Sequence, residues 1–322
     1  MSHPDPFAVR ALLGPDASPC RRAITGERGV ALPAFTDHHV HLHLIDEHGL
    51  GARGIAAVVD LGGDPVALAR RRHESMPRVA YAGAFLTAVG GYPSGRAWAP
   101  DAVVRQVSDP SPLPGVAGGA GTAVDEQASF GASVIKVALN ALAGPVFDRV
   151  ALRAVIAAAR SHGLPVVAHV EGDGMTERAI EAGVDVLAHA PFSERLDETL
   201  VRRAASSQRW ISTLGIHGAD PEAEANAADN LARFAADGGR VLYGTDLGNG
   251  EQPAGVNVRE LEALHAAGVR GGGLIAALSD PWPFAERSHA VATFVPGDPP
   301  ADVDAVPDWL AAATVLPAEE LV

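Results

Sequence analysis

The sequence alternates between short apolar, strand-like runs and helical stretches along most of its length. The predicted strands are residues 32–40, 54–61, 79–86, 133–139, 165–170, 184–188, 210–214 and 241–245. Strands that alternate with helices are typical of parallel α/β architectures, because each helix returns the chain to the start of the next strand. Eight such units in 322 residues predict a (β/α)8 TIM-like barrel with a small, truncated β appendage from the two termini.

Several of the intervening helices have clear ends. A helix predicted over 149–162 ends at Gly163, and one over 173–182 ends at Gly183, since glycine readily adopts the left-handed conformation that closes a helix. Asn257 is placed to cap a third helix. A doubly wound dinucleotide-binding sheet would need a GxGxxG turn after the first strand, and the sequence has none there.

The same pattern divides the chain. We assign residues 31–282 to the barrel and residues 1–30 plus 283–322 to the small terminal β appendage, because chain termini often lie close together. Residues 90–125 are rich in glycine and proline and are predicted to form a long loop that faces a substrate. Arg96 and Trp98 of this loop are expected at the surface.

Composition narrows the function. With 25 basic and 39 acidic residues the net charge is −14, and no basic stripe is present to bind nucleic acid. No apolar run reaches the ~18 residues of a membrane span, and the N-terminus lacks a signal-peptide core. The single cysteine, Cys20, cannot form an internal disulfide or a cysteine-based zinc site. We expect a cytoplasmic protein that acts on a small molecule; no signal decides whether it forms a homo-oligomer.

Lysine usage is the most unusual feature of the composition. Of the 25 basic residues 24 are arginine, and Lys136 is the only lysine. A guanidinium stays charged in proteins, whereas a buried lysine amine can become neutral and nucleophilic. Because Lys136 lies within the apolar run 132–139, we predict that it takes part in chemistry rather than in surface solvation.

Polar residues recur at the carboxyl ends of the predicted strands. His39 and His41 alternate with other residues in the first strand, so their side chains point to the same side. Further polar residues lie in or just after later strands: Lys136, His169, His189 and Asp246. The carboxyl ends of barrel strands meet at one mouth, where active sites are built. This combination predicts a metal site.

The motifs that carry these residues resemble those of the amidohydrolase superfamily, in particular its imidazolonepropionase-like and prolidase-like binuclear metal-dependent hydrolases. The resemblance extends over about residues 33–278. It rests on DxHxH at 37–41, AVVDLGG at 57–63, MPRVA at 76–80, GASVIK at 131–136, AHV at 168–170, AGVDVLAH at 182–189 and GTD at 244–246. One departure is the small size of the predicted β appendage.

The resemblance implies a complete ligand set. His39, His41 and Asp246 would hold one divalent metal, while His169 and His189 would hold a second. Lys136, carboxylated by carbon dioxide to N6-carboxylysine, would bridge the two. Zinc is the default ion for histidine and carboxylate ligands, and manganese, cobalt, nickel and iron stay open.

The predicted activity is hydrolysis of an amide-type bond in a dipeptide, an N-acyl compound or a cyclic amide by a metal-bridging hydroxide. Asp246 is the candidate acid/base, and the sequence has no GxSxG nucleophile motif. A mononuclear-metal deaminase of a nucleobase-like substrate, with Glu171 near His169, is one alternative. A lactonase or ester hydrolase would use the same binuclear site. A non-catalytic, ligand-binding barrel is a further alternative, which the complete set of six candidate ligands disfavours.

Other polar residues have less specific signals. Asp37 and Asp60 lie on the first two strands and would either orient the metal-bound imidazoles or act as caps and ion pairs. Tyr92 follows two glycines where the resembled enzymes usually have a histidine. Tyr92, Asn140 and His217 are candidate substrate-binding residues at the barrel mouth.

Overall fold

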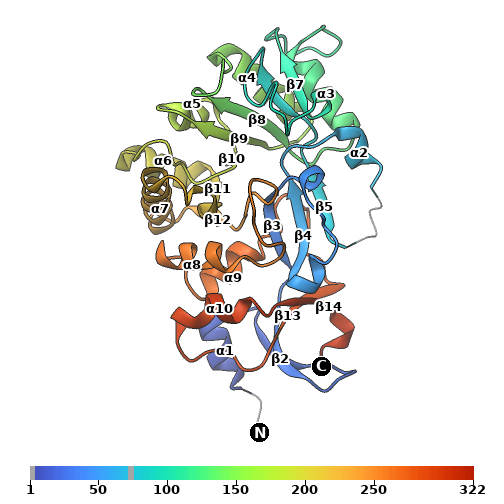
Figure 1. Ribbon diagram of the computed structural model, residues 1–322, viewed down its shortest axis with the longest axis vertical. Coiled ribbons are helices and arrows are strands. Elements are labelled where there is room, and N and C mark those ends of the chain that lie inside the picture. The colour runs from blue at the N-terminus through green and yellow to red at the C-terminus, as the bar shows by residue number, and fades with distance from the viewer. Residues whose placement is uncertain (1–3, 72–75) are drawn as a thin grey trace.

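The computed structural model describes residues 4–71 and 76–322, so residues 1–3 and 72–75 of the predicted domains lie outside it. It shows a mixed α/β fold around two parallel sheets, ordered β12-β11-β10-β9-β8-β6-β7 and β3-β4-β5 (Figure 1). The large sheet contains β6 (Phe85–Ala88), β7 (Val104–Val107), β8 (Ile135–Asn140), β9 (Val166–Glu171), β10 (Val186–Leu187), β11 (Arg209–Ile211) and β12 (Arg240–Leu242). The small sheet contains β3 (Phe35–Val40), β4 (Ile55–Asp60) and β5 (Arg78–Tyr81).

Hydrogen bonds join the edges of the two parallel sheets. The N–H of Ser133, just before β8, donates to the carbonyl of Tyr81 at the end of β5 (2.8 Å). At the other edge, the N–H of His38 in β3 donates to the carbonyl of Tyr243, just after β12 (3.0 Å). Over the described residues the ladders still do not form one continuous closed barrel. The predicted parallel α/β architecture is confirmed, and the closed (β/α)8 barrel stays a prediction.

An apolar cluster lies between the two parallel sheets. It contains Val59 and Ala80 of the small sheet, and Val167, Val186 and Ile211 of the large one. All five side chains are almost completely removed from solvent. The strands of both sheets therefore pack around a shared interior, above which their carboxyl ends present the site described below.

The prediction of one continuous strand over 79–86 is wrong. The segment forms two strands, β5 and β6, which are separated at Gly83 by a left-handed backbone (φ 75°). A Cβ atom at Gly83 would lie 2.3 Å from Oε1 of Gln127, so only glycine fits this bend. The chain then leaves the small sheet, and β6 pairs with β7 and β8.

Residues 90–125 are more ordered than the predicted loop. They contain the edge strand β7 and the first part of helix α3 (Ala120–Ser129), which buries Ala123, Val124 and Gln127. The signal for this helix is weak because it begins among glycines and has no side-chain N-cap. The prediction of a loop for the whole segment is therefore wrong at 104–107 and from residue 120 onward.

The predicted helices at 149–162, at 173–182 and after Asn257 are confirmed. The helices are α2 (Pro65–Ala69), α3, α4 (Arg149–Ser161), α5 (Met175–Ala182), α6 (Glu198–Ser207), α7 (Pro221–Ala236), α8 (Val258–Ala266) and α9 (Gly272–Leu278). Figure 1 shows α6 and α7 on the outer side of β11 and β12. There Phe234 of α7 stacks on Trp210 of β11, with ring centroids 4.0 Å apart. Within the described residues, no helix is long and apolar enough to cross a membrane.

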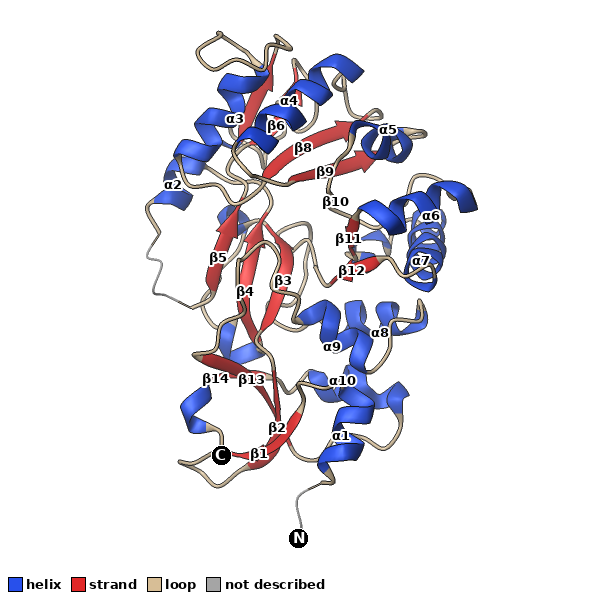
Figure 2. Cartoon of the chain, turned by 180° about the vertical axis from the view of Figure 1, so that it is seen from behind, coloured by secondary structure: helices blue, strands red, loops and turns tan. Residues whose placement is uncertain are grey.

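Both terminal regions contribute to one antiparallel sheet, ordered β1-β2-β13-β14. Its strands are β1 (Ser18–Arg21), β2 (Arg28–Leu32), β13 (Val291–Pro296) and β14 (Thr314–Pro317). Helices α1 (Pro6–Leu13) and α10 (Val306–Leu310) lie at the same end of the molecule (Figure 2). The division into a barrel at 31–282 and an appendage stays a prediction, and β2 crosses the first of its boundaries.

Candidate metal centre

The six residues proposed as metal ligands line one cavity of about 220 Å³ at the carboxyl ends of the parallel strands. They are His39, His41, Lys136, His169, His189 and Asp246, and all are buried. They come from β3, β8, β9 and the segments after β10 and β12. Residues separated by up to about two hundred positions in the chain thus meet at one mouth, as the sequence predicts for strand ends.

The first cluster consists of His39, His41 and Asp246. The Nε2 atoms of the two imidazoles lie 3.1 and 3.2 Å from the same carboxylate oxygen, Oδ1 of Asp246. One nitrogen or oxygen from each residue lies within 4.8 Å of the others. Three such atoms converging in a buried pocket match the histidine and carboxylate donors that divalent metals take in proteins.

The imidazoles of the first cluster are oriented by the main chain. Nδ1 of His39 lies 2.8 Å from the carbonyl of Ala188, and Nδ1 of His41 lies 3.0 Å from the carbonyl of Gly62. A carbonyl only accepts, so Nδ1 carries the proton and Nε2 keeps its lone pair for a metal. Nε2 of His39 and Oδ1 of Asp246 are buried without a hydrogen-bond partner within the described residues. These orphaned atoms fit a cation bound between them.

The electrostatics of this cluster favour an ionised carboxylate. Burial alone would raise the pKa of Asp246, but the two imidazoles outweigh it and hold that pKa well below its usual range. Burial also lowers the pKa of His39 well below its usual range. For His41, burial is outweighed by the nearby carboxylate of Asp246, which raises its pKa. Asp246 is therefore a negatively charged group that could bind a cation at this position.

Two buried carboxylates hold the backbone under the first cluster. Asp37 accepts the N–H and hydroxyl of Thr245 (3.1 and 2.6 Å), next to Asp246, whose backbone is left-handed (φ 55°). Asp60 accepts the N–H of Gly62 (3.0 Å), whose carbonyl orients His41. Neither carboxylate has a hydrogen bond to an imidazole of the described residues, so both act on the cluster through main-chain N–H groups.

The second cluster consists of His169 and His189. Nδ1 of His169 lies 3.1 Å from Nε2 of His189, and both atoms face the cavity. Their other ring nitrogens have polar partners: Nδ1 of His189 lies 2.9 Å from the Thr213 hydroxyl, and Nε2 of His169 lies 3.2 Å from a Glu171 oxygen. The two facing nitrogens, which contact only each other among the described residues, are therefore the pair that could hold a metal.

Lys136 lines the same cavity with 1% of its surface exposed. Its amine has neither a hydrogen bond nor an ion pair with any residue that the structure describes. Its Nζ atom lies 5.7 Å from the ring centroid of Phe85. Burial lowers the pKa of Lys136 to about 7, against the opposing charges of Asp246 and Asp60. A large fraction of the amine is then neutral at physiological pH.

The three predicted substrate residues occupy different positions. Tyr92 lines the cavity and stacks on His169, with ring centroids 5.1 Å apart. His217 also lines it, is 7% exposed, and has a buried Nε2 atom without a partner among the described residues. Asn140 does not line the cavity: it donates to Glu171 (2.5 Å) and accepts two N–H groups of its own loop.

The sequence analysis missed several residues that line this cavity. Trp98 was expected at the surface, but its ring lies against the cavity with its centroid 6.0 Å from those of Phe85 and Tyr92. Phe192 lines the cavity and packs on His217. Asn249 donates to Oδ2 of Asp246 (2.8 Å). Phe192 and Asn249 each lie three residues after a predicted ligand, a spacing that could have indicated them.

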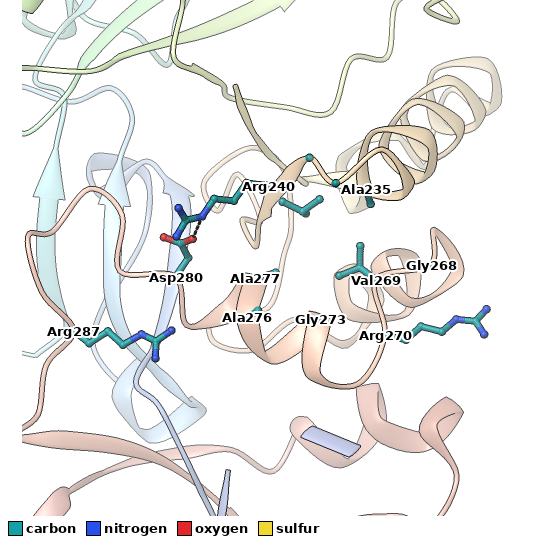
Figure 3. Close-up of a pocket in the computed structure, with 13 residues that line it drawn as sticks. Ala235, Arg240, Gly268, Val269, Arg270, Gly273, Ala276, Ala277, Asp280 and Arg287 are labelled. Atoms are coloured by element: carbon teal, nitrogen blue, oxygen red, sulfur yellow. Dashed lines mark hydrogen bonds and ion pairs between the residues drawn. The ribbon is translucent and has the colours of Figure 1, made fainter. Parts of the chain in front are cut away.

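A larger cavity, of about 560 Å³, lies at the opposite end of β12 (Figure 3). Two of its arginines are paired with carboxylates, Arg240 with Asp280 (2.6 Å) and Arg287 with Asp16 (2.7 Å), while Arg270 donates to the carbonyl of His265 (3.2 Å). Mutual neutralisation leaves little potential to attract a charged ligand. All six candidate ligands line the smaller cavity at the carboxyl ends of the strands.

No protein-family model matches the chain, and no curated protein matches its sequence. Solved structures do share its fold. A Xaa-Pro dipeptidase with methionine bound in its active site has a TM-score of 0.68 at 20% identity, covering 91% of this chain and 86% of that one. An amidohydrolase has a TM-score of 0.69 at 21% identity, with coverages of 91% and 86%. The A. niger ochratoxinase has a TM-score of 0.70 at 20% identity, with coverages of 89% and 82%. The fold is therefore one that solved hydrolases use.

Proposed function

We propose that the chain is a metal-dependent hydrolase of the amidohydrolase superfamily, cleaving an amide-type bond in a small molecule. One observation carries this proposal. Two clusters of histidine ligands face a single buried cavity that also contains the only lysine of the chain. Their ring nitrogens have outer partners that leave the inner nitrogens free for metals. The dipeptidase, the amidohydrolase and the ochratoxinase that share the fold support the same activity.

The donor set fits two divalent ions. The first cluster would hold one ion and the second cluster the other, with zinc the default for imidazole and carboxylate ligands. When bound, such a pair supplies an activated water molecule as nucleophile and polarises the scissile carbonyl. We include in this proposal that the strands of the two parallel sheets form a closed (β/α)8 barrel. Both clusters would then lie at the same rigid mouth.

Lys136 would join the two metal sites as a carbamate. In this step the neutral amine attacks the carbon of carbon dioxide, an N–C bond forms, and the nitrogen releases one proton to solvent. The product is an anionic N6-carboxylysine with two oxygen ligands. The buried, unpaired amine described above supports this reaction, because only an uncharged amine has the electron pair that it needs.

Asp246 would move the proton during catalysis. Its Oδ1 atom faces the two imidazoles of the first cluster, while Asn249 donates to Oδ2 and fixes the plane of the carboxylate. The low pKa of Asp246 keeps it ionised, and an ionised carboxylate held in place could accept a proton from the attacking water and pass it to the leaving amine. No covalent acyl-enzyme is needed in this proposal.

The shape and lining of the cavity favour a compact substrate with a flat, apolar part. Aromatic rings of Phe85, Tyr92, Trp98 and Phe192 line it, and His217 offers a buried ring nitrogen that has no hydrogen-bond partner among the described residues. Dipeptides, N-acyl compounds and cyclic amides can all be compact molecules with a flat, apolar part. Ester and lactone bonds would be attacked by the same machinery.

A mononuclear deaminase is the second candidate, because Glu171 accepts a hydrogen bond from His169 at the edge of the cavity (3.2 Å). In that reaction a carboxylate beside a single metal shuttles the proton to the leaving ammonia. The hydrogen bonds that Glu171 accepts from His169 and Asn140 fit a residue that orients a ligand better than one that moves a proton.

The deciding experiment is reconstitution with zinc and bicarbonate, followed by metal analysis and a screen of amide substrates. The proposal predicts two metals per chain and turnover of at least one amide, dipeptide or cyclic amide. The matched control is His39→Asn/His41→Asn, which should abolish turnover while the protein stays folded. One metal per chain together with ammonia release from a nucleobase-like compound would replace this proposal by the deaminase. No bound metal would contradict both.

A further inference from the structure

Thr213, just after β11, has an unusual backbone. Its φ and ψ angles are 43° and 36°, in the left-handed region. Among the described residues, Asp246 is the only other non-glycine residue with a positive φ. A β-branched residue rarely adopts this conformation, because its side chain is crowded against the main chain. Such strain persists only where the surrounding structure enforces it, and it is concentrated at functional sites.

The strained conformation places the Thr213 hydroxyl on the second cluster. Its Oγ1 atom lies 2.9 Å from Nδ1 of His189, while its N–H donates to the carbonyl of Gly244 (3.0 Å). A hydroxyl that accepts the Nδ1 proton keeps the lone pair of His189 on Nε2, which faces His169 in the cavity. Thr213 therefore decides which nitrogen of His189 can bind a metal.

Glu260, in the first turn of α8, holds the residues that follow Thr213. Its two carboxylate oxygens accept the N–H groups of Leu214 (3.0 Å) and Gly215 (2.7 Å). Two consecutive main-chain donors on one carboxylate fix the direction of the chain as it leaves Thr213. Asn257 caps α8 and accepts the N–H of Glu260 itself (3.4 Å), which anchors the other end of the contact.

The placement of Glu260 is costly. Only 1% of its surface is exposed, and no cation forms an ion pair with it in the part of the chain that the structure describes. Burial raises its pKa to about 7, against hydrogen bonds from Ser212, Leu214 and Gly215. A buried carboxylate without a cation opposes folding unless hydrogen bonds compensate for the lost water. A role in positioning His189 through Thr213 explains this unfavourable burial better than a contribution to stability does.

We propose that Glu260 is a positioning residue for the second metal site, acting through the strained backbone of Thr213 on the orientation of His189. The inference rests on the proposed binuclear site. Loss of the carboxylate would let residues 213–215 relax towards an ordinary conformation, carry the Thr213 hydroxyl away from Nδ1, and free His189 to rotate or change tautomer. The first cluster has no contact with Glu260 and should keep its affinity.

The test is stepwise zinc titration of the metal-free protein, in bicarbonate, by calorimetry. In Glu260→Gln the side-chain NH2 group would face one of the two main-chain N–H groups that the carboxylate now accepts. One of the two hydrogen bonds to residues 214 and 215 is therefore lost. We expect the Kd of the second zinc to rise about 10- to 100-fold, with the first unchanged. The matched control is Asp185→Asn, which alters a carboxylate that accepts a main-chain N–H (Val166, 2.8 Å) at the start of β9. It should change neither Kd.

Thr213 variants test the intermediate link without touching the buried carboxylate. Thr213→Val replaces the hydroxyl with a methyl group and should weaken binding of the second zinc ion as Glu260→Gln does. Thr213→Ser keeps a hydroxyl and should bind the second zinc ion as tightly as the wild-type protein. Because both changes act on one link, Glu260→Gln/Thr213→Val should cost no more than either single variant. If Glu260→Gln does not fold, the contrast between the valine and serine variants decides.

The outcomes separate this inference from the proposed function. If the wild-type protein binds two zinc ions and neither Glu260→Gln nor Thr213→Val weakens the second, the positioning role is overturned. Additive losses in the double variant would also overturn the route through Thr213. If the wild-type protein binds fewer than two ions, the binuclear function itself fails, and the positioning role fails with it.

Discussion

The two histidine clusters of the cavity are anchored in different ways. In the first cluster, both outer imidazole nitrogens lie on main-chain carbonyls, those of Ala188 and Gly62. In the second cluster, both lie on side chains, those of Glu171 and Thr213. A carbonyl in a strand or a tight turn moves only with the backbone, whereas a side chain can rotate or change its protonation. The first cluster is therefore a preformed site, and the second can be tuned.

This contrast implies an order of metal binding. The first cluster offers three converging ligands and a carboxylate that is ionised in advance. The second offers two imidazoles, and in the proposed site it needs the carbamate of Lys136 to complete its ligand set. We therefore expect the first ion to bind more tightly and the second to depend on carbon dioxide. The predictions below test this difference between the clusters.

The largest effect is expected at Asp246, which belongs to the first cluster. Asp246→Asn keeps one oxygen as a metal ligand but removes the carboxylate that accepts the proton, so kcat should fall about 10³-fold. Metal binding to the second cluster should persist. Turnover numbers and metal content of the same preparation check this. Unchanged turnover would remove the acid/base role of Asp246.

The next largest effect is expected at Lys136. A guanidinium cannot form a carbamate, so Lys136→Arg should retain one zinc ion, lose the second, and lower kcat at least ~100-fold. Lys136→Met is the companion variant, because it also lacks the carbamate and carries no buried charge. Metal analysis by mass spectrometry gives the stoichiometry. Two ions retained in both variants would exclude a bridging lysine.

A smaller effect is expected at Glu171. Glu171→Gln weakens the acceptor for Nε2 of His169, and the Kd of the second ion should rise about tenfold with little change in the first. Glu177→Gln, an exposed glutamate of α5, makes the same change of charge and should leave both values unchanged. Equal weakening of both ions by Glu171→Gln would contradict separate anchoring of the clusters.

The smallest effect concerns His217, beside the second cluster. Burial lowers the pKa of His217 from 6.5 to about 4. Between these values the unfolded chain binds a proton that the folded protein excludes, so the free energy of unfolding falls as the pH falls. From pH 7 to pH 5 this contribution is about 2 kcal/mol. Urea unfolding of metal-free protein should show it, and His217→Gln should lack it. The same pH dependence in both would mean that water reaches this imidazole.

The sequence predicts well which candidate ligands meet at one cavity, because they occupy the ends of periodic strands. His39, His41, His169 and His189 each end or follow an apolar run, and parallel strands bring such ends together. The fold prediction fails where local conformation is set by a distant contact. The bend at Gly83, which splits one predicted strand into two, depends on a helix more than forty residues away.

The residues that orient the site could not be predicted in the same way. Glu260 reads as an ordinary charged residue in the first turn of a helix, yet the structure buries it against a loop 45 residues earlier. Trp98 sits in a segment rich in glycine and proline, where nothing in the periodicity points inward. Contacts of this kind depend on how the helices pack, which no local pattern specifies.

The most direct test of the binuclear account is the number of zinc ions per chain after reconstitution with bicarbonate and after reconstitution in carbon-dioxide-free buffer. The account predicts two ions in the first case and one in the second, because only the carbamate of Lys136 completes the second site. The same number in both buffers, or no bound metal in either, would contradict it.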